Sequence, residues 1–302
     1  MKPMFARVFR VGSYLFCLSM GIVIGRSDAQ EGAKVSQPTG QTAAQKAELL
    51  KAFASEFIHI TPGKGRFPKT FTMGAPQPNE QPAHEVRMQT HFSIAKYEVP
   101  QDLYKAVTGT NPSVWGGPRN SVEMVTWADA RQFCRRATIL MRQARLIAKD
   151  EQIRLPSEAE WEYCCRAGTN TSFSFGDSAT KPSDAGKKAS LLDPYGWHTG
   201  NAAGNDPPVG ALKPNAWGLY DMHGYLWEYV DDAFHATYED APADGTAWDA
   251  AKPFQDRVIR GGSWRDRHER LTSTTRASLP DHVRSDAIGF RCVKAKLPSD
   301  PP

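Results

Sequence analysis

The 302-residue sequence has few cysteines, no internal repeat and no segment in which charge of one sign dominates. Its 37 Lys and Arg nearly balance its 33 Asp and Glu, which gives a formal net charge of +4. Because the basic residues do not gather on one segment, we expect a mixed-charge soluble surface and no nucleic-acid partner. Hydrophobic residues make up 40% of the chain, enough for the packed core of one large domain or two modest ones.

Long apolar runs are also missing, apart from one near the start of the chain. Residues 11–24 are mostly apolar, follow a basic start and are followed by a Ser-x-Ala sequence that ends at Ala29. The run is short for a helix that has to cross about 30 Å of hydrocarbon, so an uncleaved anchor is the less favoured alternative. We predict that residues 1–29 are a cleaved signal peptide. The mature protein is then expected to be exported, periplasmic or secreted, without stable membrane insertion.

None of the five cysteines forms a Cys-x-x-Cys pair, which argues against a zinc knuckle. Cys17 lies within the predicted signal peptide, so Cys134, Cys164, Cys165 and Cys292 remain in the exported chain. In an oxidising compartment these four residues are candidates for disulfides, and they allow three pairings.

Composition divides the remaining chain into a linker, one domain and a tail. Residues 30–47 are small, polar and interrupted by Pro and Gly, which predicts a flexible linker. In residues 48–297, short strand-like runs such as FIHI and FSIAKYEV alternate with turns, and loops rich in Gly, Pro, Asn and Trp dominate the second half. Residues 298–302 are predicted to be a frayed tail.

Three helices are predicted from hydrophobic spacing and from start and stop signals. They fall within residues 99–109, 126–150 and 156–168. The third helix is predicted to begin with a capping box formed by Ser157 and Glu160. Helices of this kind among short strands indicate an α+β domain with a high loop content.

Six stretches occur in order between about Phe57 and Lys296: FTMG, KYEVPQDLYKAVTGTNPS, VEMVTWADARQFC, RLPSEAEWEYCCRAG, KPNAWGLYDMHGYLWEY, and RVIRGGSW followed by GFRC. Together they resemble the formylglycine-generating enzyme family, also called sulfatase-modifying factor proteins. The resemblance implies a single α+β domain related to the C-type lectin fold, with little regular secondary structure. It also implies an ancestral activity, the oxygen-dependent conversion of a sulfatase cysteine to Cα-formylglycine.

The resemblance fails at the positions that carry this activity. In the family, two cysteines after the GGS(W/Y) turn bind Cu(I) and the substrate thiolate, because this soft ion prefers thiolate sulfur. Here the two positions hold Asp266 and Leu271. A carboxylate is a hard ligand, leucine has no donor atom, and His268 beside Asp266 does not reproduce a two-thiolate site. We therefore expect no copper, and we assign no catalytic residue.

The cleft beside the turn is still expected to bind a peptide or protein segment, with a glycan as the alternative. The candidate pocket residues are Ser263, Trp264, Asp266, His268 and Arg276. For Arg276, and for Arg291 in the GFRC motif, an internal ion pair is the alternative. For Ser263 and Trp264 the alternative is core packing.

The resemblance also implies a structural calcium ion in the DMHGYLWE loop. The family's ligands there, two side chains and two backbone carbonyls, map to Asp221, Glu228, Gly224 and Leu226. Carboxylates that bracket a glycine are hard oxygen donors suited to Ca²⁺, although such a loop could also be a solvated acidic segment. The family's usual Asn is Tyr225 here, and a second family site near residues 197–208 has no ligands that we can match.

For the cysteines, the resemblance implies a disulfide between Cys134 and Cys292. Closing so long a loop would stabilise the fold by about 4–5 kcal/mol. Cys165 matches another family disulfide position, but its partner position holds Arg276. Cys164 and Cys165 are therefore left as adjacent thiols or a strained pair, and we expect them to be buried and inert.

The sequence is compatible with two functions. The first is an exported lectin-like binding scaffold that has lost the oxidase centre. The second is an oxidoreductase of the same superfamily that uses another metal or the polar residues Asp266, His268, Glu269 and Arg270. Related iron-dependent sulfoxide synthases take histidines from an additional helical domain, for which this chain is too short. We therefore favour the scaffold.

Overall fold

The computed structural model describes residues 40–203, 206–250 and 255–297, and its first helix, α1 (Ala43–Ser55), follows a capping box. The Thr42 hydroxyl accepts the Gln45 amide at 3.2 Å, and the Gln45 side chain accepts the Thr42 amide at 2.8 Å. The predicted linker boundary at residue 47 is therefore wrong, since this capping box starts the domain earlier. The predicted signal peptide and tail lie outside the described residues.

The three predicted helices are confirmed. They are α2 (Gln101–Thr108), α3 (Trp127–Gln143) and α4 (Glu158–Arg166). The capping box of α4 forms as expected, because Ser157 and Glu160 each accept the other's backbone N–H. None of the helices in the described ranges has the length and apolarity needed to cross a membrane.

The strands form three small sheets. The first has the order β1 (Phe57–Ile60), β4 (Phe92–Ala95), β10 (Val293–Lys296) and β5 (Glu151–Arg154). The second pairs β2 (Thr70–Met73) with β3 (His84–Arg87). The third has the order β8 (Arg276–Pro280), β7 (Asp256–Arg260), β6 (Trp227–Ala233) and β9 (Ile288–Gly289). Neighbouring strands are antiparallel, except that β6 and β9 are parallel.

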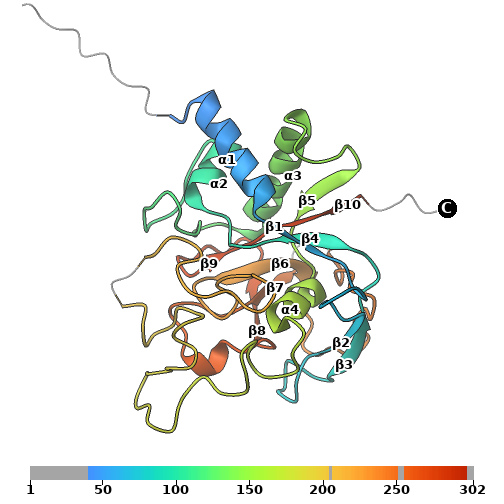
Figure 1. Ribbon diagram of the computed structural model, residues 1–302, viewed down its shortest axis with the longest axis vertical. Helices are drawn as coiled ribbons and strands as arrows, with labels where there is room; N and C mark the ends of the chain where they lie inside the picture. The colour runs from blue at the N-terminus through green and yellow to red at the C-terminus, as the bar shows by residue number, and fades with distance from the viewer. Residues whose placement is uncertain (1–39, 204–205, 251–254, 298–302) are drawn as a thin grey trace, which may run out of the picture. The chain divides into compact units, whose positions relative to one another are not determined.

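Helices α1, α2 and α3 lie on one side of the β1–β4–β10–β5 sheet (Figure 1). Helix α4, the β8–β7–β6–β9 sheet and most of the long loops lie on the other side. One hydrophobic cluster joins the first three helices to this sheet through residues such as Phe133 and Phe290. A second cluster surrounds α4 and contains Trp161 and Trp217. The predicted loop-rich α+β class is confirmed.

Buried ion pairs connect α4 to β7 and β8. Arg276 binds both carboxylate oxygens of Glu158, at 2.7 and 2.9 Å, and Arg260 donates to Glu162 at 2.6 Å. All four side chains are nearly or completely buried. Arg276 is therefore an internal ion-pair partner, which was the alternative that the sequence left open for it.

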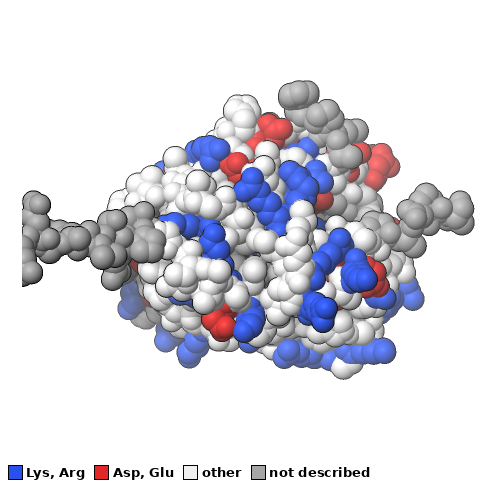
Figure 2. Space-filling model, turned by 90° about the horizontal axis from the view of Figure 1, so that it is seen from above, with Lys and Arg blue, Asp and Glu red and all other residues white. Residues whose placement is uncertain are grey.

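The surface has mixed charge. On the face that Figure 2 shows, seen from the top of Figure 1, Lys and Arg side chains are spread among uncharged residues and are more frequent than Asp and Glu. This distribution agrees with the dispersed basic residues of the sequence and its net charge of +4.

Candidate functional site

The turn that carries the family's first cysteine position is closed by a carboxylate. Gly261 and Gly262 both have positive φ, at 95° and 73°, and bring the chain to Ser263. One oxygen of Asp266 accepts the Ser263 amide at 3.0 Å and the Ser263 hydroxyl at 2.7 Å, and it also accepts the indole N–H of Trp227 at 2.8 Å. Asp266 thus holds the turn together instead of presenting a metal ligand.

The second cysteine position is filled by a core side chain. Leu271 has no exposed surface and packs in a small cluster with Phe173 and Leu192. Two glycines lie directly against it, since a Cβ at Gly224 would come within 2.4 Å of Leu271 Cδ2 and one at Gly262 within 3.0 Å of Cδ1. The space beside the turn is therefore occupied by hydrocarbon.

A buried histidine forms a hydrogen bond with the backbone of Leu271. His223 Nδ1 lies 2.8 Å from the Leu271 carbonyl oxygen, and its Nε2 accepts the Ser174 amide at 3.1 Å. This pattern assigns the proton to Nδ1 and keeps the ring neutral. Burial lowers the pKa of His223 to about 4.

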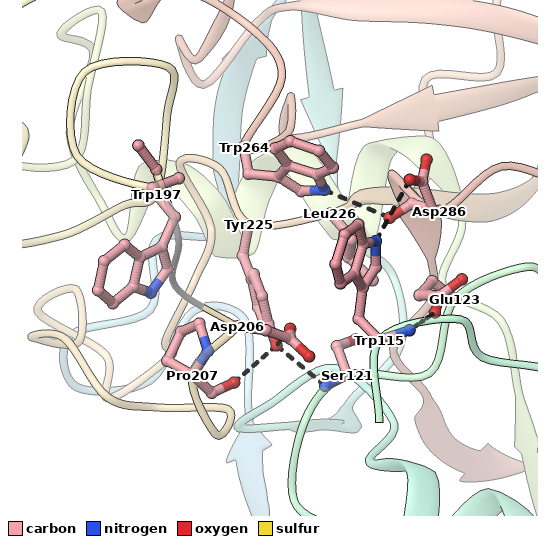
Figure 3. A pocket seen from close by; sticks show the side chains of 12 residues that line it. Trp115, Ser121, Glu123, Trp197, Asp206, Pro207, Tyr225, Leu226, Trp264 and Asp286 are labelled. Atoms are coloured by element: carbon pink, nitrogen blue, oxygen red, sulfur yellow. Dashed lines mark hydrogen bonds between the residues drawn. The ribbon is translucent and has the colours of Figure 1, made fainter. Parts of the chain in front are cut away.

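A pocket of about 200 Å³ lies beside the turn and has Trp264 in its wall (Figure 3). Its wall contains three indoles, one phenol and three carboxylates among mostly small or apolar residues. The lining residues are Trp115, Ser121, Glu123, Trp197, Ala202, Ala203, Asp206, Pro207, Tyr225, Leu226, Trp264 and Asp286. In Figure 3, Trp197 and Trp115 lie on opposite sides of Tyr225.

Tyr225 joins the loops that form this pocket. Its φ of 126° is unusual for a residue with a side chain, and strained backbone of this kind clusters at functional sites. The phenol donates to the Pro207 carbonyl at 2.7 Å and accepts the Ser121 amide at 3.2 Å. The residue that replaces the family's usual Asn is therefore part of the wall of the pocket.

Of the five pocket residues predicted from the sequence, Trp264 lines the pocket. Ser263 and Asp266 form the turn behind it, and Arg276 lies in the ion pairs with α4. His268 lies on a short 3-10 turn (His268–Arg270), 3.6 Å from Glu269. The turn at residues 261–266 therefore lies at the pocket. Arg276 does not line the pocket and forms a buried ion pair with Glu158.

The sequence analysis missed most of the pocket. Trp115, Glu123, Trp197, Asp206 and Asp286 come from loops that are far apart in the chain. The high frequency of Trp in these loops was the available signal, and it did not say which indoles would converge.

The predicted calcium ligands show a mixed arrangement. Both oxygens of Glu228 accept Arg291 at 2.6 Å, and one of them also accepts the Trp161 indole N–H at 2.9 Å. Asp221 accepts the Gly210 amide with one oxygen, and its other oxygen is buried without a partner. Arg291 is thus an internal ion-pair partner, and Asp221 retains one oxygen without a partner that could bind a metal ion.

Glu98 adds a second free oxygen beside the same loop. One of its oxygens accepts the Leu226 amide at 3.1 Å, and the other is buried without a partner. Burial and then the charges of Glu228 and Asp221 raise the pKa of Glu98 well above its usual range, and burial raises the pKa of Asp221 to about 6.

These carboxylates are hard donors that fit Ca²⁺, with Glu98 and Asp221 offering the free oxygens. No three His, Cys, Asp or Glu side chains in the described parts of the chain are placed to hold an ion by themselves. A cation here would therefore also need the backbone carbonyls that the resemblance implies, those of Gly224 and Leu226.

The four described cysteines are buried thiols. Cys134 Sγ and Cys292 Sγ lie 3.8 Å apart, close enough that a small movement would allow the predicted disulfide, which stays a prediction. Cys164 and Cys165 lie within α4, and burial raises the pKa of both thiols, to about 12 for Cys165. Neutral buried thiols are poor nucleophiles, which agrees with the expected inert state.

The chain matches the Sulfatase-modifying factor enzyme 1-like domain over residues 51–296 and therefore belongs to this family. The resemblance carried by the six sequence motifs is confirmed.

Three relatives illustrate the range of the family. Formylglycine-generating enzyme of Bos taurus is 30% identical over 211 residues, which cover 63% of this chain and 48% of that protein. Chaperone protein LppX of Paenibacillus barcinonensis is 26% identical over 242 residues, 68% of this chain and 80% of LppX. Inactive C-alpha-formylglycine-generating enzyme 2 of Mus musculus is 27% identical over 221 residues, 70% and 62% of the two chains. The family thus contains proteins named as enzymes, as a chaperone and as inactive.

Solved structures agree with the fold. The structure of PvdO from Pseudomonas aeruginosa has 31% sequence identity and a TM-score of 0.62, and it covers 76% of this chain and 91% of PvdO. Variable protein 1 of Treponema denticola has 24% sequence identity and a TM-score of 0.64, and the match covers 78% of this chain and 94% of that protein. This likeness shows the shared fold. The chain spans about half the length of the formylglycine-generating enzymes of Bos taurus and Mycobacterium tuberculosis, at 48% and 50%.

We expect His223 to make stability depend on pH. Its pKa is about 4 in the folded protein and about 6.5 in the unfolded chain, so between these values the unfolded state binds the extra proton. The free energy of unfolding should therefore fall by about 3 kcal/mol from this residue as the pH is lowered from about 6.5 to about 4. Urea unfolding across this range measures the effect.

The variant His223→Asn should lose this part of the pH dependence, whereas His282→Asn, at an exposed side chain, should keep it. Other titrating groups are common to all three proteins, so the difference between the curves isolates His223. Parallel curves for the wild type and His223→Asn would refute the assignment.

Proposed function

We propose that this protein is an exported member of the sulfatase-modifying factor family that binds a peptide or protein segment and does not oxidise cysteine. The observation that supports it most is the state of the two thiolate positions. Asp266 accepts two hydrogen bonds from Ser263 within the turn and one from Trp227 of β6, and Leu271 is a fully buried core residue. A two-thiolate copper centre therefore has neither its ligands nor its space.

The alternative oxidoreductase would need a different redox centre, and the polar residues of the turn support one poorly. Glu269 and Arg270 have more than half of their side-chain surface exposed, and His268 contacts Glu269 at 3.6 Å. Glu269 and Arg270, which are directed to solvent, are not preorganised to hold a metal, and His268 alone is a single ligand. The binding function is therefore the better supported of the two.

The pocket supports binding because it combines apolar walls with polar atoms that lack partners. The buried polar atoms without a hydrogen-bond partner include Ser121 Oγ, Glu123 Oε2 and Trp197 Nε1, all on lining residues. The lining residue Trp115 and its chain neighbour Val114 are 48% and 63% exposed and form an apolar surface next to the pocket. A bound segment would cover this apolar surface and satisfy these atoms.

Binding without conversion is the expected outcome when random heptapeptides, each with one cysteine, are passed over the immobilised protein with copper and oxygen. Retained peptides should keep their thiol in mass spectra, and Trp197→Ala should retain fewer of them. Trp248→Ala is the matched control, since this indole stacks on His235 and does not line the pocket.

The formylglycine-generating enzyme of Streptomyces coelicolor, a relative 31% identical over 197 residues, serves as the positive control for aldehyde formation. An aldehyde made by the wild-type protein would overturn the loss of oxidase activity. If the protein retains no peptide at all, the binding function is wrong.

We also propose that residues 1–29 direct export and that Cys134 and Cys292 then form a disulfide. The intact mass of protein recovered from its host should correspond to a chain that begins at Gln30 and should increase by two hydrogens on reduction. Cys134→Ser should remove that increase and lower the free energy of unfolding by about 4–5 kcal/mol. A chain that begins at Met1, or four thiols that react without reductant once the protein is unfolded, would contradict the proposal.

A structural Ca²⁺ ion at Glu98 and Asp221 is the third part of the proposal. Bound calcium would neutralise the excess negative charge and should stabilise the fold by about 2.7 kcal/mol at a hundredfold excess over Kd. Thermal unfolding with calcium or with a chelator measures this, and Glu98→Gln should abolish the difference. Glu269→Gln, at an exposed side chain, should not. Identical transitions of the wild type in both buffers would rule the site out.

A further inference from the structure

The aromatic pocket is acidic in a protein whose overall charge is positive. Its lining contains Glu123, Asp206 and Asp286 and no Lys or Arg. Asp286 is neutralised by Arg265, which lies 2.6 Å away. Among the described residues, Glu123 and Asp206 contact no basic side chain, so about two negative charges remain at the pocket.

These carboxylates are held in place by hydrogen bonds from the protein. Glu123 is 2% exposed and accepts the amides of Val114 and Trp115 with one oxygen. Asp206 accepts the Asn120 amide and contacts the Tyr225 hydroxyl at 3.2 Å. Burial raises the pKa of Glu123, which is the expected cost of a carboxylate without a cation. A bound cation would remove that cost.

Besides negative charge, the pocket offers aromatic rings that can bind a cation. Cations are attracted to the faces of Trp and Tyr rings, and four such rings line this pocket. The protein already uses this interaction at the site, because the Arg265 guanidinium lies 4.7 Å from the centre of the Trp264 ring. In Figure 3 the Trp197 and Trp115 rings stand apart on the two sides of Tyr225, with the Asp206 carboxylate below.

The number of free hydrogen-bond acceptors in the pocket distinguishes a cation with many N–H donors from a cation with none. A guanidinium has five N–H donors to satisfy. Asp206 and Asp286 already accept hydrogen bonds from Asn120, Trp115 and Arg265. The buried lining acceptors without a partner are Glu123 Oε2 and Ser121 Oγ, and Asp286 Oδ1 accepts neither of the two hydrogen bonds to that carboxylate, so the free acceptors are fewer than the five donors of a guanidinium. A cation that needs no hydrogen bonds, only ring faces and nearby negative charge, suits this wall better.

We propose that the pocket binds an alkylated ammonium group, either of a small molecule or of a methylated lysine in the bound segment. This rests on the proposed use of the pocket for ligand binding. The ammonium methyl groups contact the faces of Trp115, Trp197 and Trp264, and the carboxylates of Glu123 and Asp206 supply the counter-charge. The free indole N–H of Trp197 donates to a carbonyl or hydroxyl elsewhere in the ligand.

The test uses pairs of probes that differ in charge alone. Choline is compared with its carba analogue, and a short peptide with trimethyllysine is compared with the same peptide carrying the carba side chain or arginine. Calorimetry and tryptophan fluorescence give the affinities. Each ammonium probe should bind about tenfold or more tightly than its neutral analogue. Tighter binding of the peptide than of choline identifies the lysine source, and equal binding identifies the small molecule.

Protein variants check where the preference arises. Asp206→Asn and Trp197→Leu should each reduce the preference for charge, and Asp240→Asn, at an exposed site outside the pocket, should leave it unchanged. Equal affinity for charged and neutral probes, tighter binding of the arginine peptide, or no binding of any probe would overturn the inference. If random cysteine peptides are still retained through Trp197 in that case, the proposed function stands and this inference alone fails.

Discussion

Buried pairs of arginine and carboxylate hold together a domain that has little regular secondary structure. Arg276 and Glu158 connect β8 to α4, and Arg291 and Glu228 connect the segment between β9 and β10 to β6. Buried charges are expensive unless they are paired and hydrogen-bonded, so each pair specifies one arrangement of the loops around it. The GGSW turn follows β7, and its position depends on this framework.

Within that framework, one turn carries both the two positions where the family resemblance implies copper ligands and part of the pocket wall. Leu271 fills the space next to Gly224 and Gly262, and Asp266 binds back onto Ser263 and Trp227. Asp266 and Leu271 are thus used within the protein, whereas Trp264 of the same turn lines the pocket together with Tyr225. The fold of the family is thus retained, and the pocket beside the turn is lined by aromatic and carboxylate groups.

Much of the fold could be predicted from local sequence. The α4 capping box of Ser157 and Glu160 is a short-range pattern, and it forms as expected. The start of α1 was missed, although its Thr42 and Gln45 follow the same chemistry, because the surrounding residues resemble a linker. Arg276 was ambiguous, since an arginine in a cleft and an arginine in a buried pair look the same in a sequence.

The sequence by itself determined the family and the three helices after the linker, because these depend on residue identity and short spacing. It also placed Asp266 and Leu271 at the two positions where the resemblance implies cysteines. Tertiary structure decided that Leu271 is buried, that Glu228 is taken by Arg291, and that Glu98 is the carboxylate with a free oxygen. It also assembled the pocket from Trp115, Trp197 and Trp264. Contacts between loops that are distant in the chain depend on how the whole domain packs, and no local pattern encodes them.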